Sequence, residues 1–223
     1  MAGLGRKQWS AGDVFTSSDV NGYLMDQSVM VFAGTAARAS AIPTPSAGMV
    51  SYSTATGLEL YNGSVWSSVG KVLQVVSTAL TSTYTDSSAS GTLTTITGLS
   101  ATITPSATSS KILVLASVSV GGTDGSRFVF GLTGGNTATA YIGDTAGSRK
   151  RVATGQIPAE PNGLMQVSLM FLDSPATTSS TTYSVQTASI AGETVYVNRA
   201  GTDTDNANHC RGASTITVME ISA

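Results

Sequence analysis

From Lys71 onward, the chain alternates apolar and polar residues over short segments that are separated by turn-forming residues. Alternation with a period of two is the pattern of β-strands, because successive side chains of a strand point to opposite faces of the sheet. Nothing of helical period appears over a useful length. We therefore predict an all-β fold for this part, a jelly-roll-like antiparallel β sandwich of about ten short strands.

Two of these segments, Lys111–Val120 and Leu164–Leu172, carry apolar residues on both sides. Strands of this kind typically belong to a sheet that has a packed layer on each of its two faces. The chain has no further helix to provide the second cover, so we expect sister subunits to provide it in a symmetric oligomer. The first side comprises Ile112, Val114, Ala116, Val118 and Val120, with Met165, Val167, Leu169 and Phe171; the second comprises Leu113, Leu115, Met170 and Leu172.

Further strands are predicted where alternation continues between turn signals. They are Leu73–Ser77, Thr92–Ile96, Ala101–Thr104, Arg127–Leu132, Ala138–Ile142, Thr182–Ala188, Thr194–Asn198 and Thr215–Ile221.

The first 70 residues follow a different pattern. Thr16 and Asp19 fit a capping box, which predicts a helix from about Ser18 to Val31. Val20, Leu24, Gln27 and Val31 have the spacing of one helix face. This face fits either a coiled-coil seam, with Gln27 as a polar seam residue, or a helix packed on the chain's own β meander, which follows it in the sequence.

A proline-containing spacer, Ala41–Pro45, is expected to be extended. A three-stranded β meander follows, with a hairpin turn at Asn62-Gly63 and Trp66 as its anchor; its strands are Met49–Tyr52, Leu58–Tyr61 and Val65–Val69. These small elements enclose little apolar surface. We therefore predict two domains: residues 1–70 as an attachment segment that an assembly stabilises, and residues 71–223 as the head that it carries.

Composition narrows the classes of partner. Charged residues are 11% of the chain and the net charge is −2, so we expect no nucleic-acid binding. A hydrophobic content of 41% argues against disorder. The sequence contains no long apolar run and no apolar secretory leader, so we expect no membrane insertion and synthesis in a cytoplasm. Cys210 is the single cysteine, so an intrachain disulfide is excluded.

The chemistry-bearing residues do not form a recognisable site. His209 and Cys210 would point to opposite sides of a strand, and two ligands are too few for zinc. The spacing of Asp203, Asp205 and Asn208 does not fit a calcium loop. The glutamates Glu59, Glu160, Glu193 and Glu220 leave a glycan hydrolase as a minor alternative. We expect no enzyme activity, no catalytic residue, no metal and no cofactor.

The basic cluster Ser148–Arg151 has two readings: a solvated loop, or a site that docks to an acidic patch or a phosphate.

Residues 9–69 resemble the N-terminal segment of tail-fibre and minor virion proteins of tailed bacteriophages. The resemblance lies in Trp9–Val14, Asn21, Leu24, Gln27, Val29–Ala33, Ala36–Arg38, Pro45, Gly48–Val50 and Tyr61–Trp66. The later part looks like a β-sandwich head that follows such segments. This likeness lies in Ile103–Pro105, Ser110–Val114, Asp173–Pro175, Thr182-Tyr183, Val195–Arg199 and Ser214–Ile221.

The resemblance implies a homotrimer whose N-terminal segment attaches a fibre or spike to other virion proteins of the tail, baseplate or capsid. It implies residence in the virion. The residues expected to take part in attachment are Trp9, Gly12, Asp13, Val20, Leu24, Gln27, Phe32, Arg38, Tyr61 and Trp66.

The leading expectation is a non-enzymatic fibre or spike whose head is a candidate for binding a host-surface glycan or protein. The candidate binding loops are Thr123–Ser126, Gly134–Thr137 and Thr202–His209. The alternatives are a capsid decoration protein or head fibre without receptor binding and, third, a polysaccharide depolymerase.

Overall fold

The structure is a computed structural model that describes residues 10–14, 16–20, 29–88, 91–154, 157–158 and 161–222. The chain divides into two compact units, Met1–Lys71 (unit 1) and Val72–Ala223 (unit 2). The boundary predicted from the sequence, after residue 70, lies one residue from this division.

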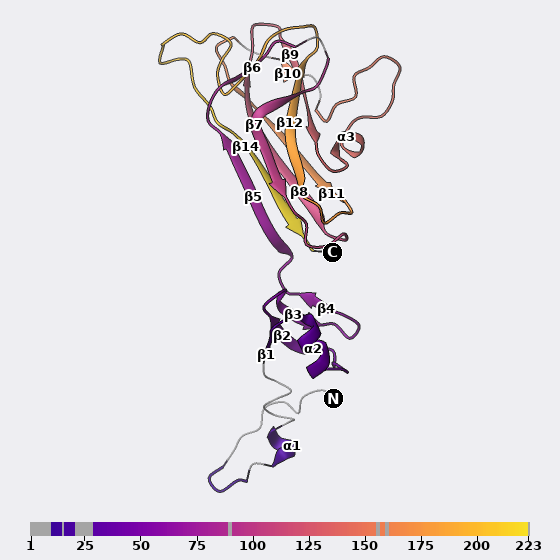
Figure 1. Ribbon diagram of the computed structural model, residues 1–223. Helices are drawn as coiled ribbons and strands as arrows, with labels where there is room; N and C mark the ends of the chain where they lie inside the picture. The colour runs from indigo at the N-terminus through magenta and orange to yellow at the C-terminus, as the bar shows by residue number, and fades with distance from the viewer. Residues whose placement is uncertain are drawn as a thin grey trace. The chain divides into compact units, whose positions relative to one another are not determined.

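The regular secondary structure of unit 2 consists almost wholly of strands, which long loops connect (Figure 1). They are β5 (Val72–Leu80), β6 (Tyr84–Asp86), β7 (Thr94–Ile103), β8 (Lys111–Gly121), β9 (Arg127–Thr133), β10 (Ile157–Pro158), β11 (Met165–Asp173), β12 (Thr181–Ser189), β13 (Val195–Val197) and β14 (Ser214–Ile221). One short helix, α3 (Thr137–Ala140), follows β9.

The strands form two antiparallel sheets. One has the order β5-β14-β8-β11, and β13 and β6 extend it beyond the start of β14. The other has the order β10-β9-β12-β7. The chain crosses repeatedly between the sheets, and these two orders of four strands are those of a jelly roll. The predicted all-β sandwich is confirmed.

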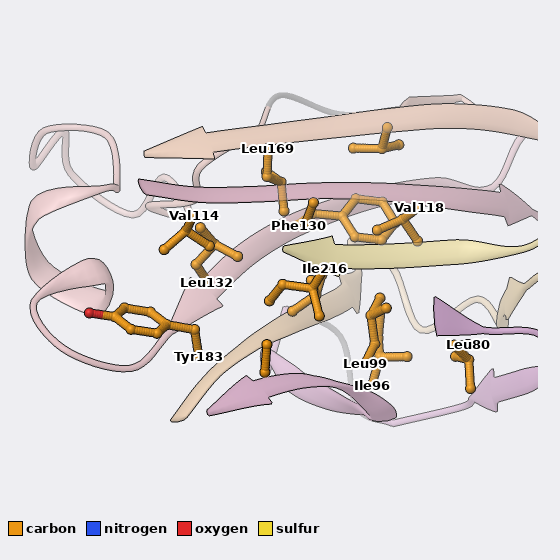
Figure 2. Close-up of a cluster of buried hydrophobic side chains, with 14 of the residues drawn as sticks. Leu80, Ile96, Leu99, Val114, Val118, Phe130, Leu132, Leu169, Tyr183 and Ile216 are labelled. Carbon is orange, nitrogen blue, oxygen red and sulfur yellow. The ribbon is translucent and has the colours of Figure 1, made fainter. Parts of the chain in front are cut away.

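The core of unit 2 lies between the two sheets. Figure 2 shows Leu169, Val118 and Ile216 of the first sheet packed toward Phe130, Leu132 and Leu99 of the second. These side chains are almost fully buried. Each stabilises the fold by about 1.5–3 kcal/mol relative to an exposed position, so the sandwich has a core of its own.

In its described residues, unit 1 contains a four-stranded sheet and two short helices. The elements are α1 (Ser17–Asp19), β1 (Met30–Phe32), α2 (Thr35–Ala41), β2 (Val50–Ser53), β3 (Gly57–Tyr61) and β4 (Trp66–Ser68). The order of the sheet is β1-β2-β3-β4. The antiparallel meander β2-β3-β4 was predicted, whereas β1, which runs parallel to β2, was not.

The capping box at Thr16 is present, because the Thr16 side chain accepts from the Asp19 N–H at 3.1 Å and the Asp19 carboxylate accepts from the Thr16 N–H. The prediction that this helix reaches Val31 is wrong. Met30 and Val31 belong to β1, where they pair with Ser51 and Tyr52. Backbone pairing with β2 outweighs the helical spacing there. Residues 21–28 of the predicted helix, with Leu24 and Gln27, lie outside the described residues.

The helix α2 was not predicted, and Ala41, expected in the extended spacer, is its last residue. Alanine is the strongest helix former, and the residue before Pro43 is biased away from helix, so the helix ends at Ala41.

Unit 2 also corrects the predicted strands. Thr92–Ile96 and Ala101–Thr104 contribute to one strand, β7, which continues through Gly98 at φ +86°. The strand predicted at Ala138–Ile142 is wrong, because Thr137–Ala140 form α3, where the Thr137 hydroxyl donates to the Gly134 carbonyl. β6 and β10 were missed, since two or three residues carry too little alternation.

Candidate functional site

The side of sheet β5-β14-β8-β11 that faces away from the core, here called the outer face, carries a block of apolar residues. Strand register aligns them in rows across the sheet. One row is Leu172, Leu113, Met219 and Val75, and the next is Met170, Leu115, Thr217 and Ser77. The second apolar side predicted for β8 and β11 therefore extends over β14 and β5.

The apolar residues of the outer face are open to solvent in a single chain. Met170 is 66% exposed, Val75 55% and Leu172 48%, and Leu113, Leu115 and Met219 are half-buried. Scattered exposed apolar residues are ordinary, but contiguous rows of them mark an interaction surface. Removing such side chains from water is favourable by about 25 cal/mol for each Å² of apolar surface buried.

The outer face also has a polar part toward the end of the sandwich where β5 ends. Ser119 donates to Gln166 at 2.9 Å, and Gln166 in turn donates to Ser117. A hollow of about 370 Å³ lies where the apolar and polar parts meet. It is lined by Leu115, Ala116, Ser117, Ser168, Leu169, Met170, Thr215 and Thr217. The face thus offers hydrocarbon and hydroxyl groups but no charge at this position.

In unit 1, the structure brings three of the predicted attachment residues together. The Arg38 guanidinium lies over the Trp66 ring at 4.6 Å, and the ring centroids of Tyr61 and Trp66 are 5.4 Å apart. Glu59 completes the group through an ion pair with Arg38. Sequence reasoning did not single out this pair. The available signal was that charges are rare in this chain and that Glu59 alternates with Leu58 and Leu60 in a strand.

The other predicted attachment residues lie elsewhere. Gly12, at φ +95°, and Asp13 form a separate turn, in which the Asp13 carboxylate accepts from the Ser10 N–H at 2.8 Å. Val20 caps α1, and Phe32 is half-buried in β1. Trp9, Leu24 and Gln27 lie outside the described residues.

The three candidate binding loops divide between the two ends of the sandwich. Thr123–Ser126 and Thr202–His209 lie at the end where β5 finishes, and Gly201 packs directly on the Gly122 carbonyl. Gly134–Thr137 lies at the opposite end, where the Asn136 amide donates to the Ser174 carbonyl at 2.7 Å. A single binding surface therefore includes at most the first two loops.

The charged residues of the loop after β13 bind one another. The Asp203 carboxylate accepts from Arg211 at 2.8 Å and lies 3.6 Å from Arg199, whose guanidinium stacks over Tyr196. His209 and Cys210 lie in this loop and not in a strand, and His209 contacts the Thr204 hydroxyl at 2.9 Å. Within the described residues, no group of three or more His, Cys, Asp or Glu side chains is placed to hold a metal.

Two buried carboxylates of unit 2 have structural partners that the sequence did not reveal. Asp173 accepts from the Tyr183 hydroxyl at 2.7 Å and from the Ser174 N–H at 2.8 Å. Burial, and then the bond to Asp173, raise the pKa of Tyr183 above its ordinary value.

Glu220 accepts from the Ser106 N–H and from the hydroxyls of Ser106 and Ser110 at 2.6–2.7 Å. Burial alone would raise the pKa of Glu220, but these hydrogen bonds outweigh it and lower the pKa.

Comparison with known proteins adds little to this geometry. No protein-family model matches the chain, and no curated protein matches it. A solved structure of infectious bursal disease virus, Gx strain, is similar over 75% of this chain, with 11% sequence identity and a TM-score of 0.33. The chain spans 43% of the length of that viral chain. A likeness of this degree is not evidence for a shared function.

Among the residues that the structure describes, no helix is long and apolar enough to cross a membrane.

Proposed function

We propose that this protein is a structural protein of a bacteriophage virion. It forms a homotrimeric fibre or spike that is anchored by unit 1 and displays unit 2 as its head. The resemblance of residues 9–69 to tail-fibre and minor virion proteins supports the assignment to a virion. The division of the chain into a small unit and an independent jelly roll supports the separation of anchor from head.

The observation that carries the proposal is the outer face of sheet β5-β14-β8-β11. One row of apolar residues extends over all four strands and a second extends over β11 and β8, and these residues are exposed or half-buried in one chain. In the trimer, sister heads cover this face, because a neutral apolar surface gains most from an equally apolar partner.

The proposal includes no catalytic step. Two of the four glutamates have structural roles, Glu59 in the ion pair with Arg38 and Glu220 in the bonds to Ser106 and Ser110. A glycosidase needs two carboxyl groups that flank a substrate bond. Glu193 accepts from the Ala191 N–H beside it at the surface, which is the setting of a turn.

The end of the sandwich where β5 finishes is the proposed surface for contact with the host. The loops Thr123–Ser126 and Thr202–His209 meet there. The chain enters unit 2 at the opposite end, through Val72, so these loops lie away from the junction with the anchor. Their hydroxyl and amide groups suit a glycan or a protein surface.

Immunogold electron microscopy of the virion tests the location. An antibody raised against residues 71–223 is expected to label the tail or baseplate. Label spread over the capsid shell would favour the alternative, a decoration protein or head fibre.

Incubating purified protein with encapsulated host cells tests the third possibility, a polysaccharide depolymerase. Clearing of the capsule would identify a depolymerase and contradict a purely structural role.

A further inference from the structure

The sheet of unit 1 carries apolar residues on both of its sides, yet the residues it buries most deeply are polar. The buried residues of its described part are all polar: Arg38, Ser51, Ser53 and Glu59. Each is at most 7% exposed. In the described part of unit 1, no apolar side chain is buried to this extent. The side of the sheet that α2 covers through the Arg38–Glu59 pair thus buries polar groups most deeply. Its apolar residues, Met30, Phe32, Tyr61 and Trp66, are only half-buried.

The opposite side, here called the open face of unit 1, is apolar. Register places Val31 beside Tyr52, and Tyr52 beside Leu58, and Leu60 lies on the same side beside Val50. Val31 is 71% exposed, Tyr52 and Leu58 are each 43% exposed, and Leu60 is 41% exposed. This side of the sheet thus presents hydrocarbon to solvent.

This arrangement leaves unit 1 short of the usual source of stability. Hydrophobic burial dominates folding, whereas a buried ion pair contributes little after its desolvation cost. The Arg38 Nε and Ser51 Oγ atoms are moreover buried without a hydrogen-bond partner. A partner on the open face would supply the missing apolar burial, at about 1.5–3 kcal/mol for each large side chain that it covers.

We infer that the open face of unit 1 is covered by the same face of sister copies, so that the anchor is a composite of several chains. Two observations favour a sister copy over another protein. The residues placed on this face, Val31, Val50, Tyr52, Leu58 and Leu60, carry no charge, so identical faces meet without repulsion. A charged partner would find nothing complementary there.

The second observation is the short connection between the units. Three residues separate Ser68 at the end of β4 from Val72 at the start of β5, a span of at most about 14 Å. Association of the heads, on which this inference rests, therefore holds copies of unit 1 at a high effective concentration, in the millimolar range for short linkers. Weak apolar contacts between open faces suffice at that concentration.

Thiol labelling of the purified full chain tests this inference, because no other protein is then present to cover the face. Slow labelling together with a monomeric mass would show that the chain covers the face by itself, and would overturn the inference. Cys210 is the single cysteine and is exposed, so Cys210→Ser gives a background without thiols. In that background, Val31→Cys, Leu58→Cys and Leu60→Cys each place one thiol on the open face. Ser40→Cys, on the exposed surface of α2, is the matched control.

We expect maleimide to label the three open-face thiols about tenfold more slowly than the thiol of the Ser40→Cys control, with the difference lost in mild denaturant. Light scattering on the same samples separates the two proposals. A trimeric mass with open-face thiols as reactive as the control thiol would overturn this inference and leave the trimer standing. A monomeric mass with reactive thiols would overturn both.

Discussion

At Gly135, backbone conformation and surroundings both require a residue without a side chain. Its φ of +51° is in the left-handed region, and a Cβ there would overlap the Asp173 carboxylate and lie 2.7 Å from the Tyr183 hydroxyl. Gly147 has a similar φ, +60°, but open space around it. Comparing alanine substitutions at these two glycines therefore separates the cost of backbone strain from the cost of steric overlap.

We expect Gly147→Ala to cost about 1 kcal/mol, the usual penalty of the left-handed region, and Gly135→Ala to cost on the order of 2 kcal/mol more. Urea unfolding of both variants measures the difference. Equal destabilisation would show that the Asp173 carboxylate and the Tyr183 hydroxyl can move aside for a methyl group.

Glu220 makes the stability of the head depend on pH. Because the folded state lowers the pKa of Glu220, its contribution to stability is complete above the unfolded pKa of about 4.3 and is lost as pH falls through the folded value. We expect Glu220→Gln to lower the free energy of unfolding at pH 7 by about 1–3 kcal/mol and to flatten its decline below pH 4.3 or so.

Thermal unfolding between neutral and acidic pH tests this expectation. Ser109→Ala, at an exposed position beside Ser110, is the control that should leave the profile unchanged. A Glu220→Gln profile that runs parallel to the wild type would contradict the assigned role.

At the scale of elements, the outer face is the feature that the sequence indicated most directly. Leu113, Leu115, Met170 and Leu172 were placed on a second apolar side by alternation alone, and the register confirms that they are neighbours. Val75 and Met219 could not be assigned to this face from the sequence, because their positions depend on the pairing of β14 with β8 and of β5 with β14.

Other elements depended on pairing that no local pattern encodes. β1 was predicted as the end of a helix, because Val20 and Val31 fit a helical spacing, yet its partner β2 lies 20 residues further along the chain. The Arg38–Glu59 pair likewise joins a helix to a strand 21 residues away. Asp173 in β11 binds the loop after β9 through the Asn136 N–H. Glu220 in β14 binds the loop between β7 and β8 through the Ser110 hydroxyl.

We expect Met170→Asp to dissociate the proposed trimer while each head keeps its fold. Met170 is 66% exposed in a single chain, so a carboxylate there is solvated in the monomer but buried without a partner in the interface. Light scattering and circular dichroism report mass and fold together. Thr95→Asp, an exposed position on the other sheet, is the matched control and should remain trimeric.

At the scale of the whole molecule, the two units differ in what keeps them folded. Unit 2 has a continuous apolar core between its sheets. The buried residues of the described part of unit 1 are polar. This difference is what we expect of the proposed function, in which assembly completes the anchor and the head has a core of its own.

Deletion of residues 1–70 is therefore expected to leave a cooperatively unfolding head that no longer joins the virion. Calorimetry of the truncated protein and its incorporation into particles measure the two parts of this prediction. Incorporation of the truncated head at the wild-type level would place the attachment determinants in unit 2.

The association of sister copies through the outer face is the central claim. Light scattering of the purified full chain at micromolar concentration tests it most directly. We predict three times the 22.6 kDa mass of one chain. A single-chain mass at that concentration would contradict it.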